Sequence, residues 1–309
     1  MDIVVVGSCV QDLTSYAPRF PKPGESVRGS KFVTGFGGKG ANQAIQAARL
    51  GAQVAMVARV GRDVFGPPTI ENFARHNINT EHCLAVDDAA TATATITVTE
   101  TGENSIVVVL GANERLAPVD VRAAEALIKQ AKWLLCQLEI PQDSILEAFK
   151  IAKKHGVKII FNPAPGDTDL NRELVGYADV ICPNENEAEI LTGLTMNSVE
   201  DATEMAQQIS KMASADSTVI ITLGPKGCLM KRAGTEPELI ATDAVTAVDT
   251  TGAGDAFVGS LAYFLAQRPD LSITEAVQRS LRIASVSVQY PGTQTSYLPR
   301  EQLPHELFQ

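Results

Sequence analysis

The strongest chemical signal in the sequence is the stretch at residues 248–257, Val-Asp-Thr-Thr-Gly-Ala-Gly-Asp-Ala-Phe. Gly252, Ala253 and Gly254 predict a loop with uncovered backbone N–H groups. Apolar residues then recur at helical spacing, so the loop should turn directly into a helix. The first N–H groups of a helix lack partners and the helix dipole is positive there. This junction could therefore bind an anion such as a phosphate group.

Asp255 stands in the first turn of that predicted helix. Beside a bound phosphate, its carboxylate could take the proton from a hydroxyl group that attacks the phosphorus atom. A purely structural interpretation is also available, because an acidic residue at a helix N-terminus stabilises the helix dipole. The stretch by itself leaves both interpretations open.

A second glycine-rich loop, Gly-Phe-Gly-Gly-Lys-Gly-Ala-Asn-Gln, occupies residues 35–43. Residues 35–40 fit the pattern G-x-G-x-x-G, but the dinucleotide-binding version of that pattern directly follows the first strand. Here it comes after a proline-rich detour, which argues against a dehydrogenase. It does not fit the Walker A pattern either. We interpret it as a loop that lets a ligand approach the backbone, with Lys39 and Asn42 as polar side chains.

The apolar runs of the sequence predict the strands and helices that could position these loops. Residues 3–6 are continuously apolar and end at Gly7, which is typical of a strand buried on both faces of a parallel sheet. Residues 7–12 follow at the carboxyl end of this strand. From residue 118 strands alternate with helices, including a helix over 118–131. The predicted strands of this part cover residues 133–138, 157–161, 178–182 and 218–223, with antiparallel edge strands at 228–231 and 238–241.

Polar side chains recur just past the ends of these predicted strands. In open α/β sheets ligands bind outside the carboxyl ends of the strands, so we expect these side chains to converge on one edge. Asp12 could contact a polar substrate there, although an Asp that merely forms a turn is an equal alternative. The other members of the set are Glu139, Asn184, Glu187 and Thr222.

Two segments do not fit the alternation of strands and helices. Residues 18–31 are rich in Pro and Gly and predict an excursion with short strands near 26–28 and 31–34, whereas 91–99 and 105–110 predict a hairpin with one wet face. Together they could form a small sheet over the large one, which is the arrangement of a lid. We therefore predict a single α/β domain over 1–309, a three-layer sandwich around a mostly parallel sheet, with a lid at about 13–34 and 91–112.

Composition narrows the function further. The chain of 309 residues has a formal net charge of −10 and no run of Lys and Arg, so neither nucleic acid nor a membrane surface is an expected partner. Five scattered cysteines without a Cys-x-x-Cys pair predict buried thiols in a reducing compartment. No signal peptide, transit sequence or apolar run of membrane length is seen. We expect a cytosolic enzyme, with the nucleus as a second compartment.

In combination, these stretches resemble the ribokinase branch of the PfkB carbohydrate-kinase family, in order over nearly the whole chain. The signature Asp-Thr-x-Gly-Ala-Gly-Asp at 249–255 is specific to the wider family, and residues 36–44 with Gln-Leu-Glu at 137–139 point to this branch. The other matching pieces are residues 7–12, 111–113, 162–165, 183–187, 222–227 and 292–294.

The resemblance implies ATP-dependent transfer of the γ-phosphoryl group to the 5-hydroxyl of D-ribose. It also implies that Asp255 is the catalytic base and that the amides of Gly252, Ala253 and Gly254 form an anion hole for the transferring group. Asn184 and Glu187 would serve the nucleotide and its Mg²⁺, as would Thr222, Leu223, Gly224, Pro225, Lys226 and Gly227, with Gly254 and Asp255 also near the nucleotide. The sugar contacts it implies are Val10, Gln11, Asp12, Gly38, Lys39, Gly40, Ala41, Asn42, Glu139 and Asp255.

A monovalent cation, K⁺, is a further implication of the resemblance. It would lie beside the anion hole, bound in several cases through backbone carbonyl groups. The implied ligands are Asp249, Thr251, Ser287, Tyr290, Gly292 and Ser296.

The sequence departs from the family pattern at a few positions. Leu281 stands where the family's helix near the adenine carries Asn or His, and Val10 and Gln11 replace the commoner Asn-Ala. A kinase with another acceptor, such as fructose or a nucleoside, therefore stays open, as does a sugar-binding regulator without activity. Exposed edges of the lid would invite pairing between subunits, so we expect a homodimer.

Overall fold

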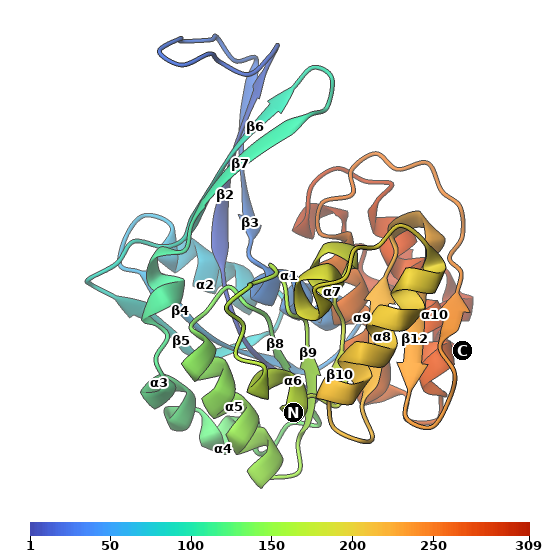
Figure 1. The fold of residues 1–309 in the computed structure, drawn as a ribbon. Helices are drawn as coiled ribbons and strands as arrows, with labels where there is room; N and C mark the ends of the chain where they lie inside the picture. Colours follow the sequence, from blue (N-terminus) through green and yellow to red (C-terminus); the bar gives the residue numbers. More distant parts are fainter.

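The computed structural model describes residues 1–309 and has two sheets (Figure 1). The large sheet has nine strands in the order β13-β12-β11-β10-β9-β8-β1-β4-β5, and only the pairs β11–β12 and β12–β13 are antiparallel. Its strands are β1 (Ile3–Val6), β4 (Val54–Gly61), β5 (Asn79–Val86), β8 (Trp133–Cys136), β9 (Lys158–Phe161), β10 (Val180–Ile181), β11 (Thr218–Thr222), β12 (Cys228–Arg232) and β13 (Glu238–Ile240).

Helices cover both faces of this sheet because the central strands are apolar on both sides. In β1, Ile3 and Val5 pack into one core cluster and Val4 and Val6 into the other. The first cluster contains side chains of α1 (Lys39–Arg49), α2 (Gly66–Arg75), α9 (Ala253–Gln267) and α10 (Ile273–Ser287). The second contains side chains of α3 (Pro118–Ala123), α4 (Glu125–Ile128), α5 (Gln142–Lys154), α6 (Glu173–Tyr177), α7 (Glu185–Thr192) and α8 (Val199–Met212). The predicted three-layer α/β fold is confirmed.

The second sheet has four strands in the order β3-β2-β6-β7 and projects from the body (Figure 1). β2 pairs antiparallel with β3 and parallel with β6, and β6 pairs antiparallel with β7. The predicted small sheet is therefore present. Its strands are β2 (Val10–Ala17), β3 (Lys31–Gly37), β6 (Thr93–Thr99) and β7 (Asn104–Val109).

Some predicted elements were wrong. No strand was predicted at residues 10–17, which form β2; only three residues separate this strand from the end of β1, and it belongs to the second sheet. Residues 26–28 form no strand, and β5 was not predicted. The expected helix over 118–131 is two short helices, α3 and α4, separated at Ala124; no Gly or Pro in the sequence marks that break.

Helices α1 and α9 pack closely against each other at Gly259. A Cβ atom added at Gly259 would lie 2.6 Å from the Gln43 carbonyl oxygen and 2.8 Å from Cβ of Gln46. Gln46 Nε2 also donates to Ser260 Oγ at 3.0 Å. Only glycine at this position allows the two backbones to come so close, and this contact places Asn42 and Gln43 of α1 beside the first turn of α9.

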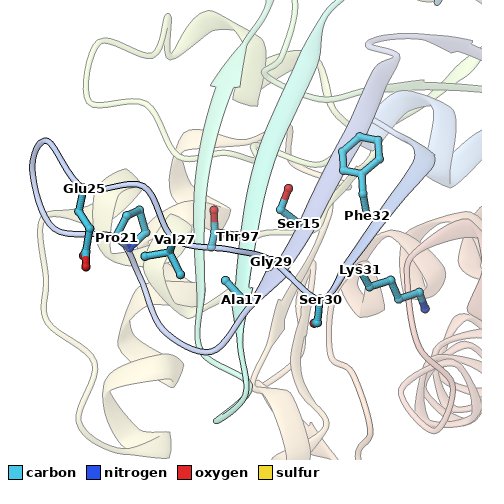
Figure 2. A pocket seen from close by; sticks show the side chains of 10 residues that line it. All are labelled: Ser15, Ala17, Pro21, Glu25, Val27, Gly29, Ser30, Lys31, Phe32 and Thr97. Atoms are coloured by element: carbon cyan, nitrogen blue, oxygen red, sulfur yellow. The ribbon is translucent and has the colours of Figure 1, made fainter.

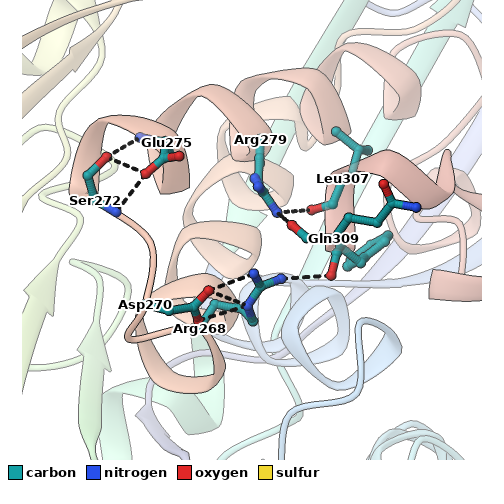
Figure 3. A network of polar contacts seen from close by, with 8 residues as sticks. Arg268, Asp270, Ser272, Glu275, Arg279, Leu307 and Gln309 are labelled. Atoms are coloured by element: carbon teal, nitrogen blue, oxygen red, sulfur yellow. Dashed lines mark hydrogen bonds and ion pairs between the residues drawn. The ribbon is translucent and has the colours of Figure 1, made fainter.

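The C-terminal residues are tied to α9 and α10 (Figure 3). Arg268 donates to the Phe308 carbonyl at 2.7 Å and forms an ion pair with Asp270. Arg279 donates to the carbonyl oxygens of Leu307 and Gln309. These contacts fix the helix pair that carries the candidate site. No helix of the structure is both long enough and apolar enough to cross a bilayer.

Candidate active site

The first turn of α9 presents unbonded backbone N–H groups. Gly252 is the N-cap and adopts a left-handed conformation with φ of 78°. The N–H groups of Gly252, Gly254 and Asp255 make no hydrogen bond within the protein, whereas Ala253 N–H donates to the Thr250 carbonyl at 3.2 Å. The expected amide cluster is therefore present, but its free donors are those of 252, 254 and 255. Such a group of donors at a helix N-terminus suits an anion.

The carboxylate of Asp255 is held by two side-chain amides of α1. Asn42 Nδ2 donates to Oδ2 and Gln43 Nε2 donates to Oδ1, each at 2.9 Å. The Asp255 side chain is buried, with 7 % exposed. Nearly all of α9 that follows is buried too. A buried acid fixed by two donors, rather than a solvated acid that caps a helix, fits the interpretation as a base better than the dipole interpretation.

A cavity of about 160 Å³ joins this turn to residues from other elements. It is lined by Gly252, Ala253, Gly254 and Asp255, by Lys39, and by Asn184, Glu187 and Thr222, among others. Asn162 and Ala164 line it as well, so five separate stretches that the sequence singled out meet at one place. Burial acts to lower the pKa of Lys39, but the nearby carboxylates of Asp255, Glu139 and Glu187 outweigh it, so the pKa is raised and the side chain stays a cation.

Glu139 and Asp12 form an acidic pair next to the α1 N-terminus. Glu139 Oε2 accepts from Lys39 N at 2.8 Å and from the Ser8 hydroxyl. Burial and the charge of Glu139 raise the pKa of Asp12 to about 7. Gly37 faces the Asp12 carboxylate so closely that an added Cβ would lie 2.5 Å from it. These acceptors beside Asn42 make a polar surface that suits a polyol.

Among the other predicted sugar contacts, Val10, Ala41 and Gly38 are available only through their backbones. Val10 is buried with Ala92 and Ala94 at the base of the lid, and Ala41 is buried in the core. Gln11 is committed elsewhere, since its Nε2 donates to the Gly35 carbonyl at 2.6 Å. Gly38 has φ of 91° and an added Cβ would lie 2.8 Å from Cys9 Cα.

The predicted nucleotide residues divide into two groups. Asn184 and Glu187 form a capping box at the start of α7, with Glu187 N bonded to Asn184 Oδ1 at 2.9 Å and Asn184 N bonded to Glu187 Oε2 at 2.8 Å. Both side chains also line the cavity. Burial raises the pKa of Glu187 to about 6, even though the backbone N–H of Asn184 lowers it.

The second group follows β11, where Thr222 pairs with Asn184 in an isolated bridge. The side chain of Leu223 is buried in the core, so only its backbone is available to a nucleotide. Gly224, Pro225 and Lys226 form an exposed turn, η2 (Gly224–Lys226), and Gly227 follows at φ of 92°.

The residues predicted to bind a cation lie in two loops that are bonded together. Asp249 Oδ2 accepts from Gly292 N at 2.8 Å and Asp249 Oδ1 accepts from Thr251 N at 2.9 Å. These bonds outweigh burial and lower the pKa of Asp249. The hydroxyl groups of Ser287 and Ser296 donate to the Ala284 and Thr293 carbonyls, which leaves their oxygen lone pairs free. Tyr290 is 43 % exposed. This set of carboxylate, hydroxyl and carbonyl oxygens fits a hard cation.

Comparison with known proteins decides between the families that such a site could belong to. A sequence profile described as pfkB family carbohydrate kinase matches residues 1–301. The chain belongs to the PfkB family of carbohydrate kinases. A ribokinase from Mus musculus is 48% identical over 307 residues, which cover 99% of this chain and 94% of that protein. A deoxyribokinase from Salmonella typhi is 37% identical over 302 residues, covering 98% of this chain and 97% of that protein.

Solved PfkB-type structures agree with the fold. The structure of Arabidopsis thaliana ribokinase complexed with ribose and ATP has a TM-score of 0.90 and 30% sequence identity, covering 97% of this chain and 96% of that one. The chain thus resembles an enzyme that was solved with both substrates of the predicted reaction.

Several residues of the site had no role assigned from the sequence. Gln43, Asn162 and Gln294 belong to stretches that carried the family resemblance, but nothing in their spacing indicated their bonds. Gln43 donates to both Asp255 and Asn162, and Gln294 donates to Asn42. Their types could have been a signal, because amide side chains inside predicted buried segments need partners. Leu281 is buried with only 6 % exposed in the cluster around α9.

A larger cavity, of about 450 Å³, lies in the lid and away from this site. Figure 2 shows it between β2 and the loop of residues 18–30, with Phe32 and Lys31 on its rim. The side chains around it come only from the lid, so it shares no residue with the cavity at α9.

Proposed function

We propose that this PfkB kinase transfers the γ-phosphoryl group of ATP to the 5-hydroxyl of D-ribose, giving D-ribose 5-phosphate and ADP. The observation that carries the proposal is the placement of Asp255 beside the unbonded amides of Gly252, Gly254 and Asp255 in one cavity. The identity of 48% to a ribokinase over nearly the whole chain supports ribose as the acceptor.

In this mechanism Asp255 takes the proton of the attacking hydroxyl and the free amides stabilise charge on the transferring group. Phosphoryl transfer depends mainly on alignment and on neutralising the equatorial oxygens. Lys39 contributes a positive charge at the same cavity. The sugar would be held by Asp12, Asn42 and Glu139, whose oxygen and nitrogen atoms can each pair with a hydroxyl group.

Two ions complete the proposal. Asn184 and Glu187 would serve the Mg²⁺ of the nucleotide, and the Asp249 and Gly292 loops would hold K⁺. Bound ions would supply positive charge next to the phosphates. The protein's own part is to hold the loops, and the Asp249–Gly292 bond together with the bond from Tyr297 Oη to the Gly252 carbonyl at 2.9 Å would link the cation loop to the amides.

The experiment for the acceptor is a panel of D-ribose, 2-deoxy-D-ribose, D-fructose and adenosine with ATP, followed by ADP release. We expect the highest kcat/KM with ribose. The deoxyribose arm addresses the second candidate, because deoxyribokinases are 37% identical to this chain. A preference for deoxyribose or adenosine would replace ribose as the acceptor while leaving the kinase chemistry intact.

The experiment for the cation compares activity in KCl with activity in an equal concentration of tetramethylammonium chloride, which holds ionic strength constant. We expect stimulation by K⁺, and we expect Asp249→Asn to weaken it because the variant loses the loop's charge. Asp243→Asn is the matched control, because Asp243 is an exposed acid in the same segment between β13 and α9. Equal stimulation in all three proteins would contradict the assignment of these loops.

We also propose that the protein forms a homodimer through the lid and works in the cytosol, with the nucleus as the alternative compartment. β7 is an edge strand and exposes a continuous apolar run, with Val107 63 % and Val109 59 % exposed. Such an edge is a template for pairing with a second strand. All five cysteines are free and buried, which suits a reducing compartment.

A further inference from the structure

Asp255 lies at the end of a continuous row of buried side-chain amides that begins on α2. Asn72 Nδ2 donates to Gln294 Oε1 at 3.0 Å, and Gln294 Nε2 donates to Asn42 Oδ1 at 3.0 Å. Asn42 Nδ2 then donates to Asp255 Oδ2 at 2.9 Å. The exposed fractions of these four side chains lie between 5 % and 8 %, so water does not compete for the bonds.

The direction of every bond in this row is fixed by its charged end. An ionised carboxylate only accepts hydrogen bonds, so Asn42 must turn its NH₂ group toward Asp255. Its carbonyl oxygen then faces Gln294, which must turn its own NH₂ group toward Asn42. By the same rule Asn72 must donate to Gln294. A reversed amide anywhere in the row would set two oxygens against each other in a buried place, which is costly.

A second branch holds the other oxygen of the carboxylate. Gln43 Nε2 donates to Asp255 Oδ1, and Gln43 Oε1 accepts from Gln137 Nε2 at 2.6 Å. This branch depends on neither Asn72 nor Gln294. A substitution in the first branch therefore affects only Asn42 and its bond to Oδ2, and the bond from Gln43 to Oδ1 remains. Its effect can thus be distinguished from a general disruption of the site.

We propose that Asn72 and Gln294 are positioning residues that orient the side-chain amide of Asn42 and, through it, the carboxylate of Asp255. Asn72 is on α2 and does not line the cavity, so it acts only through the other amides. Gln294 is itself fixed by its backbone, since Arg49 of α1 donates to its carbonyl at 2.6 Å. The inference rests on the proposed roles of Asp255 as base and Asn42 as sugar contact.

The test compares Asn72→Asp with Asn72→Ala at pH 9, where an aspartate is ionised even if burial raises its pKa by a few units. Asp has nearly the shape of Asn but cannot donate, so Gln294 and then Asn42 must reverse and turn an oxygen toward Asp255. Ala removes one bond and imposes no reversal. We expect kcat to fall about tenfold or more in Asn72→Asp, since a buried unpaired polar group of this kind typically costs that much. We expect a fall of less than about threefold in Asn72→Ala, which loses one ordinary hydrogen bond.

Ribose binding, measured by calorimetry without ATP, is the second readout. A reversed Asn42 presents the wrong group to the sugar, so Asn72→Asp should raise the ribose Kd more than Asn72→Ala does. Asn77→Asp, an exposed change just beyond the same helix, is the charge control and should match the parent. Equal effects of Asp and Ala at position 72 on both kcat and Kd would overturn the inference, because a merely structural residue does not distinguish them.

A double-variant cycle locates the effect in the row. In a Gln294→Leu background the row is already cut, so Asn72→Asp should change kcat by less than about twofold. Fully additive losses would overturn the inference. Asp255→Asn is measured alongside: if it keeps parental turnover, the role of Asp255 as base fails, whereas the ribose-binding comparison still tests the orientation of Asn42.

Discussion

At the N-terminus of α9, the carboxylate of Asp255 and the backbone N–H groups around it have separate partners. The Ala253 N–H is used by Thr250, while those of Gly252, Gly254 and Asp255 stay free beside the carboxylate. The carboxylate itself is occupied by Asn42 and Gln43, so it does not cap its own helix. These bonds keep the proposed base separate from the proposed anion donors.

At the same scale, Asp12 gives a prediction about pH. Its pKa is about 7 in the folded protein because of burial and the charge of Glu139, against 3.8 for a free aspartate. Between pH 4 and 7 the folded chain holds a proton there that the unfolded chain has released, so stability falls as pH rises and levels off above 7. The Asp12→Asn variant lacks this loss.

The measurement is chemical denaturation of the parent and Asp12→Asn at pH 5 and pH 8. The free energy of unfolding of Asp12→Asn relative to the parent should be higher at pH 8 than at pH 5. Asp243→Asn, an exposed acid, is the control and should show no such trend. The same difference at both pH values would contradict the raised pKa of Asp12.

At the residue scale, a single contiguous stretch that carries the chemistry could be predicted from the sequence, whereas contacts between side chains of distant elements could not. Residues 249–255 could be recognised because the loop, the amides and the acid are contiguous. Gln294 and Asn72 could not, because their bonds depend on how α2 and the 292–296 segment pack against α1. Val10 and Leu223 fall in stretches that were predicted to contact ligands, but their side chains are buried in hydrophobic clusters. The sequence pattern did not distinguish buried side chains from those that face the site.

At the scale of elements, the packing of α1 against α9 sets the geometry of the site. A Cβ at Gly259 would lie 2.6 Å from the Gln43 carbonyl oxygen, so Gly259→Ala must push the two helices apart. We expect a loss of about 1–3 kcal/mol in the free energy of unfolding, as is typical of overpacking. We also expect lower kcat, because Asn42 and Gln43 move away from Asp255.

Thermal unfolding and steady-state kinetics of Gly259→Ala measure both effects. Gly176→Ala in α6 is a matched control, since the nearest atom to an added Cβ there is the Met212 carbonyl oxygen at 3.9 Å. A Gly259→Ala variant with parental stability and turnover would show that the close approach of the helices does not position the base.

The same scale explains which elements could be predicted. β1, β8, β9 and β11 are apolar on both faces and were recognisable as buried parallel strands. β5 is at the sheet's edge, is mostly exposed or half-buried, and carries Glu81 and His82, so its pattern gives no strand signal. β2 was missed because it continues almost without a turn from β1 into another sheet.

For the molecule as a whole, the lid carries an unpaired edge strand with exposed apolar side chains. Every residue of β7 is exposed, including the apolar run from Ile106 to Val109. If the edge pairs with a second copy, replacing Ile106 and Val108 by Lys should give a monomer at micromolar concentration, because charges on an edge strand block pairing. Val119→Lys, which changes an apolar residue that is 59 % exposed on α3, is the control.

Analytical ultracentrifugation distinguishes the outcomes. We expect a dimer for the parent and for Val119→Lys, and a monomer for the double variant of β7. A parent protein that sediments as a monomer would remove the dimer from the account, and a double variant that stays dimeric would place the interface outside β7.

In the proposed mechanism, Asp255 removes the proton from the ribose hydroxyl group as ATP phosphorylates it. The most direct measurement is ribose-dependent ADP formation by the parent and by Asp255→Asn, with the sugar product identified by ³¹P NMR. We predict ribose 5-phosphate from the parent and a kcat about 10²–10⁴-fold lower in Asp255→Asn, the usual cost of losing a positioned base. Parental turnover in Asp255→Asn, or a product phosphorylated at another hydroxyl, would contradict the account.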